Sequence, residues 1–262
     1  MKRLFTLLVA TMTIFAVSAQ PKIIAHRGFH AAEGAARNSL NALREAQNAG
    51  LFGSECDIRV VGDGEILVLH GSMHPDKPLV GLVSTIYGTT AQLQAIKLES
   101  GETVPTFEEY LIQAKKNTNT KLIIEMKEGL TPKKESDFVK RVVKLVKKYG
   151  LQDDVEYIAF RAHICAELAR YAPKGTQIAF LGGNYTPAYC KAMGCTGIDY
   201  NYKILQRKPH WIKEAHELGM TVNAWTVDKE KDIRWCIDNG VDYITTDDPM
   251  LVKRLIDEKY KK

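Results

Sequence analysis

Short apolar segments alternate with helical patterns from residue 22 to the end of the chain, and this alternation constrains the fold most. The apolar segments are rich in Ile and Val, as expected for strands that are buried on both faces. The eight predicted strands are Lys22–Ala25, Ser54–Val60, Lys121–Met126, Val155–Phe160, Gln177–Leu181, Gly197–Tyr200, Thr221–Trp225 and Tyr243–Thr246. Eight strand–helix units in one α/β chain predict a (β/α)8 barrel of the TIM type, with a doubly wound sheet as the alternative.

The segments between the strands carry start and stop signals for helices. Ser39, Thr106 and Asp228 can cap helix N-termini, and Gly150 stands where a helix C-cap belongs. The predicted helices are Ser39–Ala49, Thr106–Lys116, Lys133–Tyr149, His163–Tyr171, Pro187–Met193, Pro209–Leu218, Lys229–Asn239 and Pro249–Tyr260.

One segment after the second strand departs from this alternation. Asp63-Gly64 is a hairpin signal between Ile58–Val61 and Glu65–Leu69, so the chain is expected to turn back on itself there. A small insertion then runs from about residue 71 to residue 102. Its Gly, Pro, Ser and Thr content predicts a loop or small cap over the barrel mouth.

The N-terminus has the pattern of a secretory signal peptide. Lys2 and Arg3 precede the apolar stretch Leu4–Val17, and small residues follow up to Ala19. This stretch is shorter than the ~20 residues that a spanning helix requires. We therefore expect residues 1–19 to be removed and residues 20–262 to form a single domain. The mature protein is expected to be exported, either periplasmic or secreted, without stable insertion in a membrane.

Charge and cysteine content exclude two classes of protein. Loss of the leader removes two basic residues from a net charge of +5, and the remaining +3 is too small to indicate nucleic-acid binding. The five cysteines match no zinc pattern. Cys190 and Cys195 could form a local disulfide in an oxidising compartment, and buried free thiols are the alternative. The oligomeric state stays open.

Acidic residues at two strand ends predict a metal site. Glu55 and Asp57 are two positions apart, so their side chains share one face of the second strand. Glu125 and Lys127 stand in the same relation on the third strand, and barrel active sites lie at the C-terminal ends of strands. Carboxylates in this arrangement suit Mg²⁺ or Ca²⁺. Ion pairing with Arg59, Lys127 or surface lysines is the alternative; we predict that Glu55, Asp57 and Glu125 bind a metal.

Two histidines and two cations accompany this cluster. His26 ends the first strand and His70 ends the hairpin strand, which suits them to divide general acid and general base catalysis. Arg27 can hold a phosphate bidentately, and Lys127 can add a point charge. Which histidine is the acid, and which group is the nucleophile, stays open.

Other residues at strand ends have weaker signals. Trp225 could form an apolar wall for the substrate or could pack at the top of the barrel. His30 and His74 are expected to line the mouth, and Asp247-Asp248-Pro249 is predicted to be structural, as the start of a helix.

In this order, the motifs of the chain resemble the glycerophosphodiester phosphodiesterase family. The segments that carry the resemblance are His26-Arg27-Gly28, Glu55-Cys56-Asp57 with His70, Val104 to Glu109, Ile124 to Lys127, Trp225 to Val227, and Ile244 to Pro249. The resemblance implies a TIM-type barrel that hydrolyses glycerophosphodiesters to an alcohol and glycerol 3-phosphate with a divalent cation. It also implies the roles already assigned: His26 and His70 for acid–base catalysis, Arg27 and Lys127 for phosphate, and Glu55, Asp57 and Glu125 for the metal.

Two positions depart from the pattern of the family. Arg37 stands where the family commonly has an acid before Asn38, and Gly71 follows His70 where the family usually has Asp. These departures bear on rate and substrate preference. Two alternatives remain. One is a phospholipase C- or D-like enzyme on the same fold, and the other, which these two departures motivate, is a non-catalytic protein that binds glycerophosphodiesters. Retention of both histidines argues against the binding protein, because a binder needs no acid–base pair.

Overall fold

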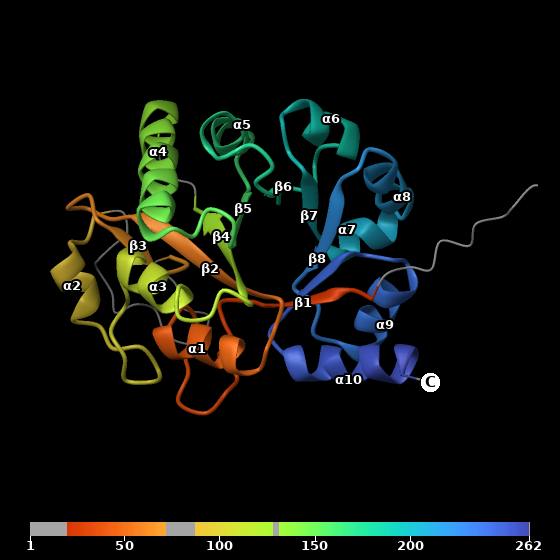
Figure 1. The fold of residues 1–262 in the computed structure, drawn as a ribbon, viewed down its shortest axis with the longest axis horizontal. Coiled ribbons are helices and arrows are strands. Elements are labelled where there is room, and N and C mark those ends of the chain that lie inside the picture. The colour runs from red at the N-terminus through yellow and green to blue at the C-terminus, as the bar shows by residue number, and fades with distance from the viewer. Residues whose placement is uncertain (1–19, 72–86, 128–130, 262) are drawn as a thin grey trace, which may run out of the picture.

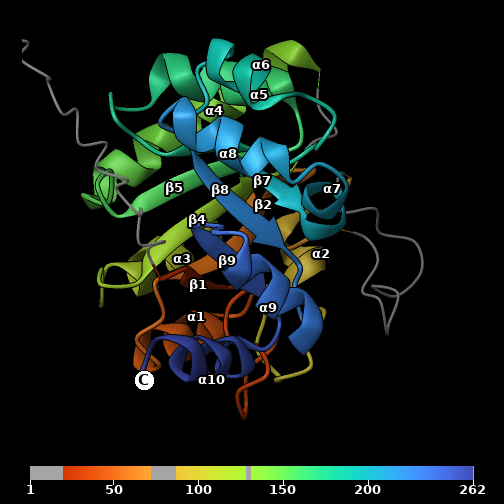
Figure 2. The same ribbon diagram turned by 90° about the vertical axis from the view of Figure 1, so that its right-hand side faces the viewer.

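A computed structural model describes residues 20–71, 87–127 and 131–261 and shows a closed parallel barrel surrounded by helices (Figures 1 and 2). The strand order is β1-β9-β8-β7-β6-β5-β4-β2, and β2 pairs with β1 to close the barrel. The barrel strands are β1 Lys22–Ala25, β2 Gly53–Val60, β4 Lys121–Met126, β5 Val155–Ala159, β6 Ile178–Phe180, β7 Gly197–Asn201, β8 Thr221–Trp225 and β9 Tyr243–Thr246. The predicted TIM-type barrel is confirmed.

One further strand, β3 (Ile66–Val68), lies outside the barrel and confirms the predicted hairpin. Strand β3 pairs antiparallel with the end of β2, with Ile58 opposite Val68. The turn contains Gly64 with a φ of +88°, a conformation that favours glycine. Of the predicted insertion, residues 72–86, which include His74, lie outside the described residues, as does the predicted leader at residues 1–19.

The eight predicted helices are present, and some of them begin at residues whose side chains cap the helix. Ser39 accepts a hydrogen bond from the Ala42 amide, and Thr106 forms a capping box with Glu109. Asp228 does not cap as predicted, because its carboxylate bonds elsewhere. The helices are α1 Leu40–Asn48, α2 Thr90–Gln94, α3 Phe107–Ala114, α4 Pro132–Tyr149, α5 Ala162–Tyr171, α6 Pro187–Ala192, α7 Tyr202–Arg207, α8 His210–Glu217, α9 Glu230–Asp238 and α10 Pro249–Tyr260.

The main core lies between the barrel and the helices. Cys56 on β2 and Met126 on β4 are buried there, on the opposite face from the predicted metal ligands. Helix α4 buries Phe138, Val142 and Val146 against this core, as an outer barrel helix should. All five cysteines are buried free thiols, so Cys190 and Cys195 form no disulfide.

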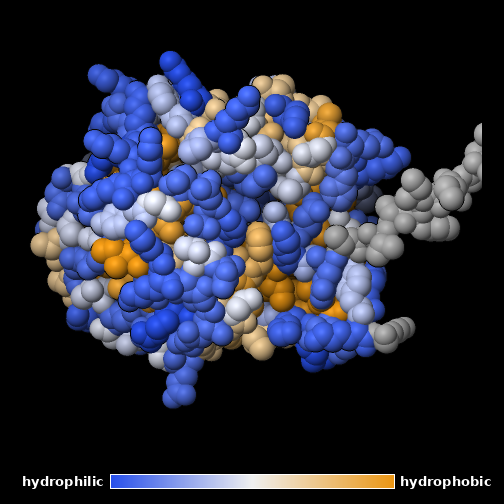
Figure 3. Space-filling model, viewed as in Figure 1, coloured by the Kyte–Doolittle hydropathy of each residue, from blue (hydrophilic) through white to orange (hydrophobic). Residues whose placement is uncertain are grey.

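The face of the molecule that is drawn in Figure 3 is largely polar. Hydrophilic residues dominate the face in Figure 3, and apolar residues gather there only in small separate groups. Among the described residues, no helix combines the length and the apolar composition that a transmembrane span needs.

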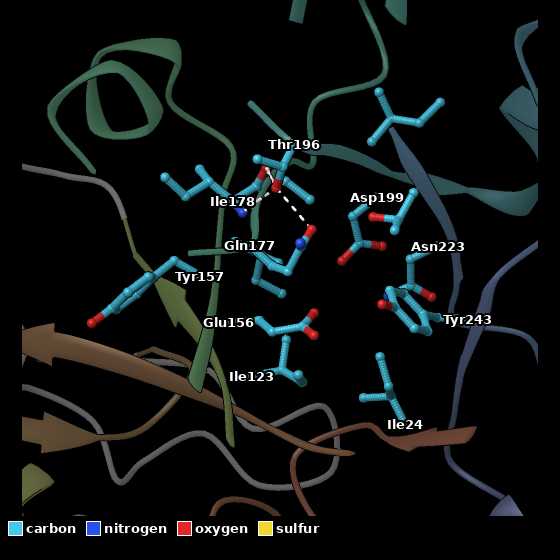
Figure 4. Close-up of a pocket in the computed structure, with 14 residues that line it drawn as sticks. Ile24, Ile123, Glu156, Tyr157, Gln177, Ile178, Thr196, Asp199, Asn223 and Tyr243 are labelled. Carbon is cyan, nitrogen blue, oxygen red and sulfur yellow. Dashed lines mark hydrogen bonds between the residues drawn. The ribbon is translucent and has the colours of Figure 1, made fainter. Parts of the chain in front are cut away.

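The barrel interior contains a small cavity with a partly polar lining (Figure 4). Glu156, Asp199 and Asn223, from β5, β7 and β8, point into it. Asp199 is 2% exposed, and its Oδ1 atom has no hydrogen-bond partner among the described residues. Burial raises the pKa of Asp199 well above its usual value. The folded protein therefore holds a proton on this carboxyl at a pH where the unfolded chain has released it.

Because Asp199 holds this proton only in the folded state, the free energy of unfolding should depend on pH. A raised folded pKa means that the stabilisation is complete below the unfolded pKa of about 4 and is lost as the pH rises toward the folded value. We expect Asp199→Asn to reduce that loss, so that the variant loses less stability than wild type between pH 5 and pH 8. Urea unfolding at pH 5 and pH 8 measures this difference. Asp153→Asn, on the surface, should leave the pH dependence unchanged, and equal behaviour of both variants would contradict the prediction.

Candidate active site

Strands β2 and β4 bring the three predicted metal ligands together at the C-terminal end of the barrel. Asp57 pairs with Glu125 in the parallel register of these strands, and Glu55 lies two residues before Asp57 on the same face. Carboxylate oxygens of all three residues lie within 4.8 Å of one another. All three side chains are buried. The alternation of residues along two neighbouring strands therefore produces the predicted carboxylate cluster.

Burial and mutual repulsion make it unfavourable to ionise all three carboxyl groups of this cluster. Burial raises the pKa of Glu55 well above its usual range, and the charges of Asp57 and Glu125 raise it further. Burial and Asp57 raise the pKa of Glu125 to about 7, against the opposing effect of Lys127. Burial alone would also raise the pKa of Asp57, but Lys127, Arg27 and other neighbours lower it to about 2. Asp57 is therefore the most firmly ionised of the three carboxylates.

Arg27 and Lys127, the predicted phosphate ligands, pair with these carboxylates. The Arg27 backbone N–H donates to Glu55 Oε2 at 2.8 Å, and its Nε atom lies 3.3 Å from Asp57 Oδ2. Lys127 Nζ lies 3.3 Å from Asp57 Oδ1 and also donates to Glu125. The two cations border the cluster, where they can also reach a bound anion.

Asn38 is a site residue that the sequence interpretation missed. Its Nδ2 donates to Asp57 Oδ2 at 2.8 Å, and its Oδ1 accepts from the Asp57 amide at 3.1 Å. Its own amide donates to the carbonyl of Arg27 at 2.9 Å. Asn38 has a φ of +61°, and asparagine tolerates this left-handed conformation better than most residues. The asparagine directly before the Ser39 cap was the available signal.

His26 belongs to a hydrogen-bond network that joins the loop after β1 to the residue after β9. Its Nδ1 atom lies 2.7 Å from Asp247 Oδ1, and His30 Nε2 lies 3.1 Å from the same oxygen. Arg37 Nη2 lies 3.8 Å from Asp247 Oδ2. His30 lines the mouth as predicted, whereas Asp247, predicted to be only structural, belongs to the site. Asp248 does cap α10.

His70 reaches the same mouth from the end of the hairpin. Although its side chain is exposed to solvent, desolvation by the surrounding protein lowers the pKa of His70 to about 4; Asp57 opposes this effect, and Lys127 and Arg27 add to it. The charges that act on His70 therefore include Asp57 of the cluster and both cations. Its carbonyl accepts from Arg59 Nε at 3.0 Å, and a side chain at Gly71 would begin 3.7 Å from the Arg59 guanidinium.

Two aromatic rings stand at the ends of β5 and β8. Trp225 and Phe160 contact edge to face, with ring centroids 5.6 Å apart and planes at 86°. Trp225 Nε1 donates to the Asp199 carbonyl at 2.8 Å, which fixes its ring. Lys127 Nζ lies 5.8 Å from the centre of the Phe160 ring. Phe160, which the sequence interpretation did not single out as a site residue, joins Trp225 in an aromatic wall beside the cluster.

Gly28 shapes the loop that carries His26 and Arg27. Its φ is +79°, and a Cβ atom there would lie 2.8 Å from the backbone carbon of Ala42. Gly34 has a similar φ of +73°, but a Cβ atom there would meet nothing within 4 Å.

This contrast predicts different costs for the same substitution. We expect Gly34→Ala to lose about 1 kcal/mol from backbone strain alone. Gly28→Ala should lose about 2–4 kcal/mol and displace the loop, because the strain is joined by the clash with α1. Thermal unfolding of both variants measures the difference, and equal losses would show that close packing on Ala42 does not matter.

Comparison with known proteins agrees with this geometry. The model of the glycerophosphoryl diester phosphodiesterase family matches residues 26–251. A crystal structure of a glycerophosphodiester phosphodiesterase from Parabacteroides distasonis is 38% identical, with a TM-score of 0.85, over 92% of this chain and 98% of that one. The glycerophosphodiester phosphodiesterase of Caldanaerobacter subterraneus is 23% identical over 89% of this chain and 97% of its own length.

A further solved structure shares the fold and holds a ligand. It is a phosphodiesterase from Oleispira antarctica in complex with its product sn-glycerol-3-phosphate, with a TM-score of 0.74 and 20% identity over 91% of this chain and 97% of that one. Its likeness extends across the barrel. With the family match across most of the sequence, the chain belongs to the glycerophosphoryl diester phosphodiesterase family and is a phosphoric diester hydrolase.

Proposed function

We propose that this protein is an exported, metal-dependent glycerophosphodiester phosphodiesterase that releases an alcohol and glycerol 3-phosphate. The observation that carries the proposal is the cluster of Glu55, Asp57 and Glu125, which Arg27 and Lys127 border at the barrel mouth. The family match and the product-bound Oleispira antarctica structure support the substrate class.

The residues present fit a divalent cation, Mg²⁺ or Ca²⁺. Three carboxylates face only two paired cations, and Glu55 Oε1 is buried without a hydrogen-bond partner among the described residues. Hard oxygen ligands of this kind are those that Mg²⁺ and Ca²⁺ prefer. Glu55, Asp57 and Glu125 would hold the ion, which would supply charge stabilisation to the phosphate oxygens.

The side chains of the protein would perform the remaining work. Arg27 and Lys127 would also contact the phosphate and neutralise part of its negative charge. Of His26 and His70, one would take a proton from the attacking water or glycerol hydroxyl, and the other would donate a proton to the leaving alcohol. Trp225 and Phe160 would contact the apolar side of the glycerol. A general acid and a general base are therefore available in one site.

Release of glycerol 3-phosphate tests the proposal. Residues 20–262 should release it from glycerophosphocholine in the presence of Mg²⁺ or Ca²⁺, with coupled enzymatic detection of the product. Ethanolamine, glycerol, serine and inositol head groups should be compared in parallel. Absence of release from every head group with either cation would reject the proposed activity, and release only from intact phospholipid vesicles would favour the phospholipase alternative.

Export has a separate test. The basic start, short apolar stretch and small residues up to Ala19 support cleavage before Gln20. Expressed from its full-length gene in its own host, the protein should begin at Gln20 and fractionate with periplasmic or secreted markers. An intact N-terminus in the cytoplasmic fraction would reject export without affecting the proposed chemistry.

A further inference from the structure

We propose that Asp247 is a positioning residue that holds His26 as its Nδ1–H tautomer and so leaves Nε2 as the nitrogen that exchanges a proton at the substrate. The inference rests on the proposed function, because it assigns a residue to the same site. It follows from three features of the described residues: the hydrogen bonds to Asp247, the support of its backbone, and the fact that Asp248, not Asp247, caps helix α10.

The hydrogen bonds define the tautomer. An ionised carboxylate only accepts hydrogen bonds, so a ring nitrogen 2.7 Å from Asp247 Oδ1 must carry a hydrogen. His26 therefore donates through Nδ1, and its Nε2 lies on the opposite edge of the ring. The next residue, Arg27, donates its amide to Glu55, which keeps the imidazole beside the carboxylate cluster.

Several contacts keep Asp247 ionised and in place. Burial would raise the pKa of Asp247, but hydrogen bonds from His26 and His30 outweigh it and hold the pKa well below its usual range. The Asp247 amide donates to Asp228 Oδ1 at 2.8 Å, and Thr246 Oγ1 donates to the same atom at 3.0 Å. Arg37, where the chain departs from the family pattern, adds its charge 3.8 Å from Oδ2.

The side chain of Asp247 has no helix-capping task. Asp248, the next residue, caps α10 by accepting from the Leu251 amide at 3.0 Å. Within the described residues, no carboxylate hydrogen-bonds the ring of His70, and Gly71 follows it in the sequence. His26 is therefore the member of the predicted catalytic pair that has a carboxylate partner.

Asp247→Asn and Asp247→Ala test the inference, with Asp248→Asn as the matched control in the same loop. Turnover of glycerophosphocholine is measured at saturating metal, together with metal affinity. The tautomer of His26 is read in ¹⁵N-histidine NMR spectra. We expect both Asp247 variants to lose about 100-fold in kcat with KM and metal affinity nearly unchanged. In Asp247→Ala, the His26 signal should shift from the Nδ1–H toward the Nε2–H tautomer. Asp247→Glu should recover part of the rate.

Two outcomes would overturn the inference: an unchanged His26 tautomer in Asp247→Ala, or an equal loss of kcat in Asp248→Asn. The NMR measurement requires no turnover. If the wild-type protein released no glycerol 3-phosphate, the proposed function would fail, while the tautomer of His26 would still test the role of Asp247.

Discussion

Replacing either His26 or His70 with alanine is expected to lower kcat for glycerophosphocholine about 10³-fold, because each removes one of the two proton transfers. Binding of glycerophosphocholine should remain, since Arg27, Lys127 and the carboxylate cluster are retained. Steady-state kinetics gives kcat, and isothermal titration calorimetry of the inactive variants gives the affinity. The double variant should be little worse than the poorer single variant, because the two groups act as a unit.

His216 offers a matched control for this experiment. Its Nε2 lies 2.9 Å from Asp242 Oδ2, which reproduces a histidine–aspartate pair on the surface, away from the carboxylate cluster. His216→Ala should keep full activity. Loss of less than about tenfold in both site variants would contradict acid–base roles for His26 and His70. Tight binding without turnover in the wild type would instead favour the binding-protein alternative.

Removing the divalent cation is expected to abolish activity, and Mg²⁺ or Ca²⁺ should restore it. The carboxylates that would hold the ion repel one another, so they should release protons when the ion binds. Because the pKa of Glu125 is about 7, the apparent metal affinity should rise as the pH increases from 5 to 7 and then level off with respect to this group. Calorimetry in buffers of different ionisation enthalpy measures both the affinity and the protons released.

The same repulsion predicts that loss of a metal ligand stabilises the metal-free protein. Since the folded pKa of Glu125 lies above its unfolded value of about 4.3, its stabilisation is present below that value and is lost as the pH rises to about 7. At pH 8 with chelator, Glu125→Gln should therefore gain about 2 kcal/mol, or roughly 4–8 °C in Tm. The variant should be inactive and should show no thermal shift with metal.

Glu135→Gln is the contrasting control. Glu135 is also buried, but it pairs with Arg161 at 3.3 Å and with His163 at 3.0 Å. Its replacement should lower Tm and leave the metal dependence intact, because the ion pairs that it breaks include none of the predicted metal ligands. A Glu125→Gln protein that is less stable than wild type in chelator would show that repulsion within the carboxylate cluster does not destabilise the metal-free protein.

Much of the barrel was predictable because its strands are buried on both faces. The predicted strand Lys121–Met126 coincides with β4, and Ser54–Val60 lies within one residue of β2. Such strands show their burial directly in their composition. Helices α2 and α7 were not predicted, because short helices of mixed composition depend on tertiary packing more than on propensity.

The carboxylate cluster could be predicted from local sequence alone. Glu55 and Asp57 share a face because side chains alternate along a strand, and Glu125 joins them because consecutive strands of the barrel are neighbours. Neither step requires knowledge of a distant contact. The left-handed conformation of Asn38 and its bonds to Asp57, in contrast, depend on how the loop before α1 packs against β2.

The partner of His26, in contrast, follows from the way in which the barrel closes. Asp247 is 221 positions away in the sequence, and its neighbours resemble an ordinary helix start. Closure of the barrel pairs β1 with β9 so that Ala25 lies opposite Thr246. The next residue of each strand, His26 and Asp247, therefore meets the other at the mouth. Local sequence cannot encode this contact, because it arises from the register in which the first and last strands pair.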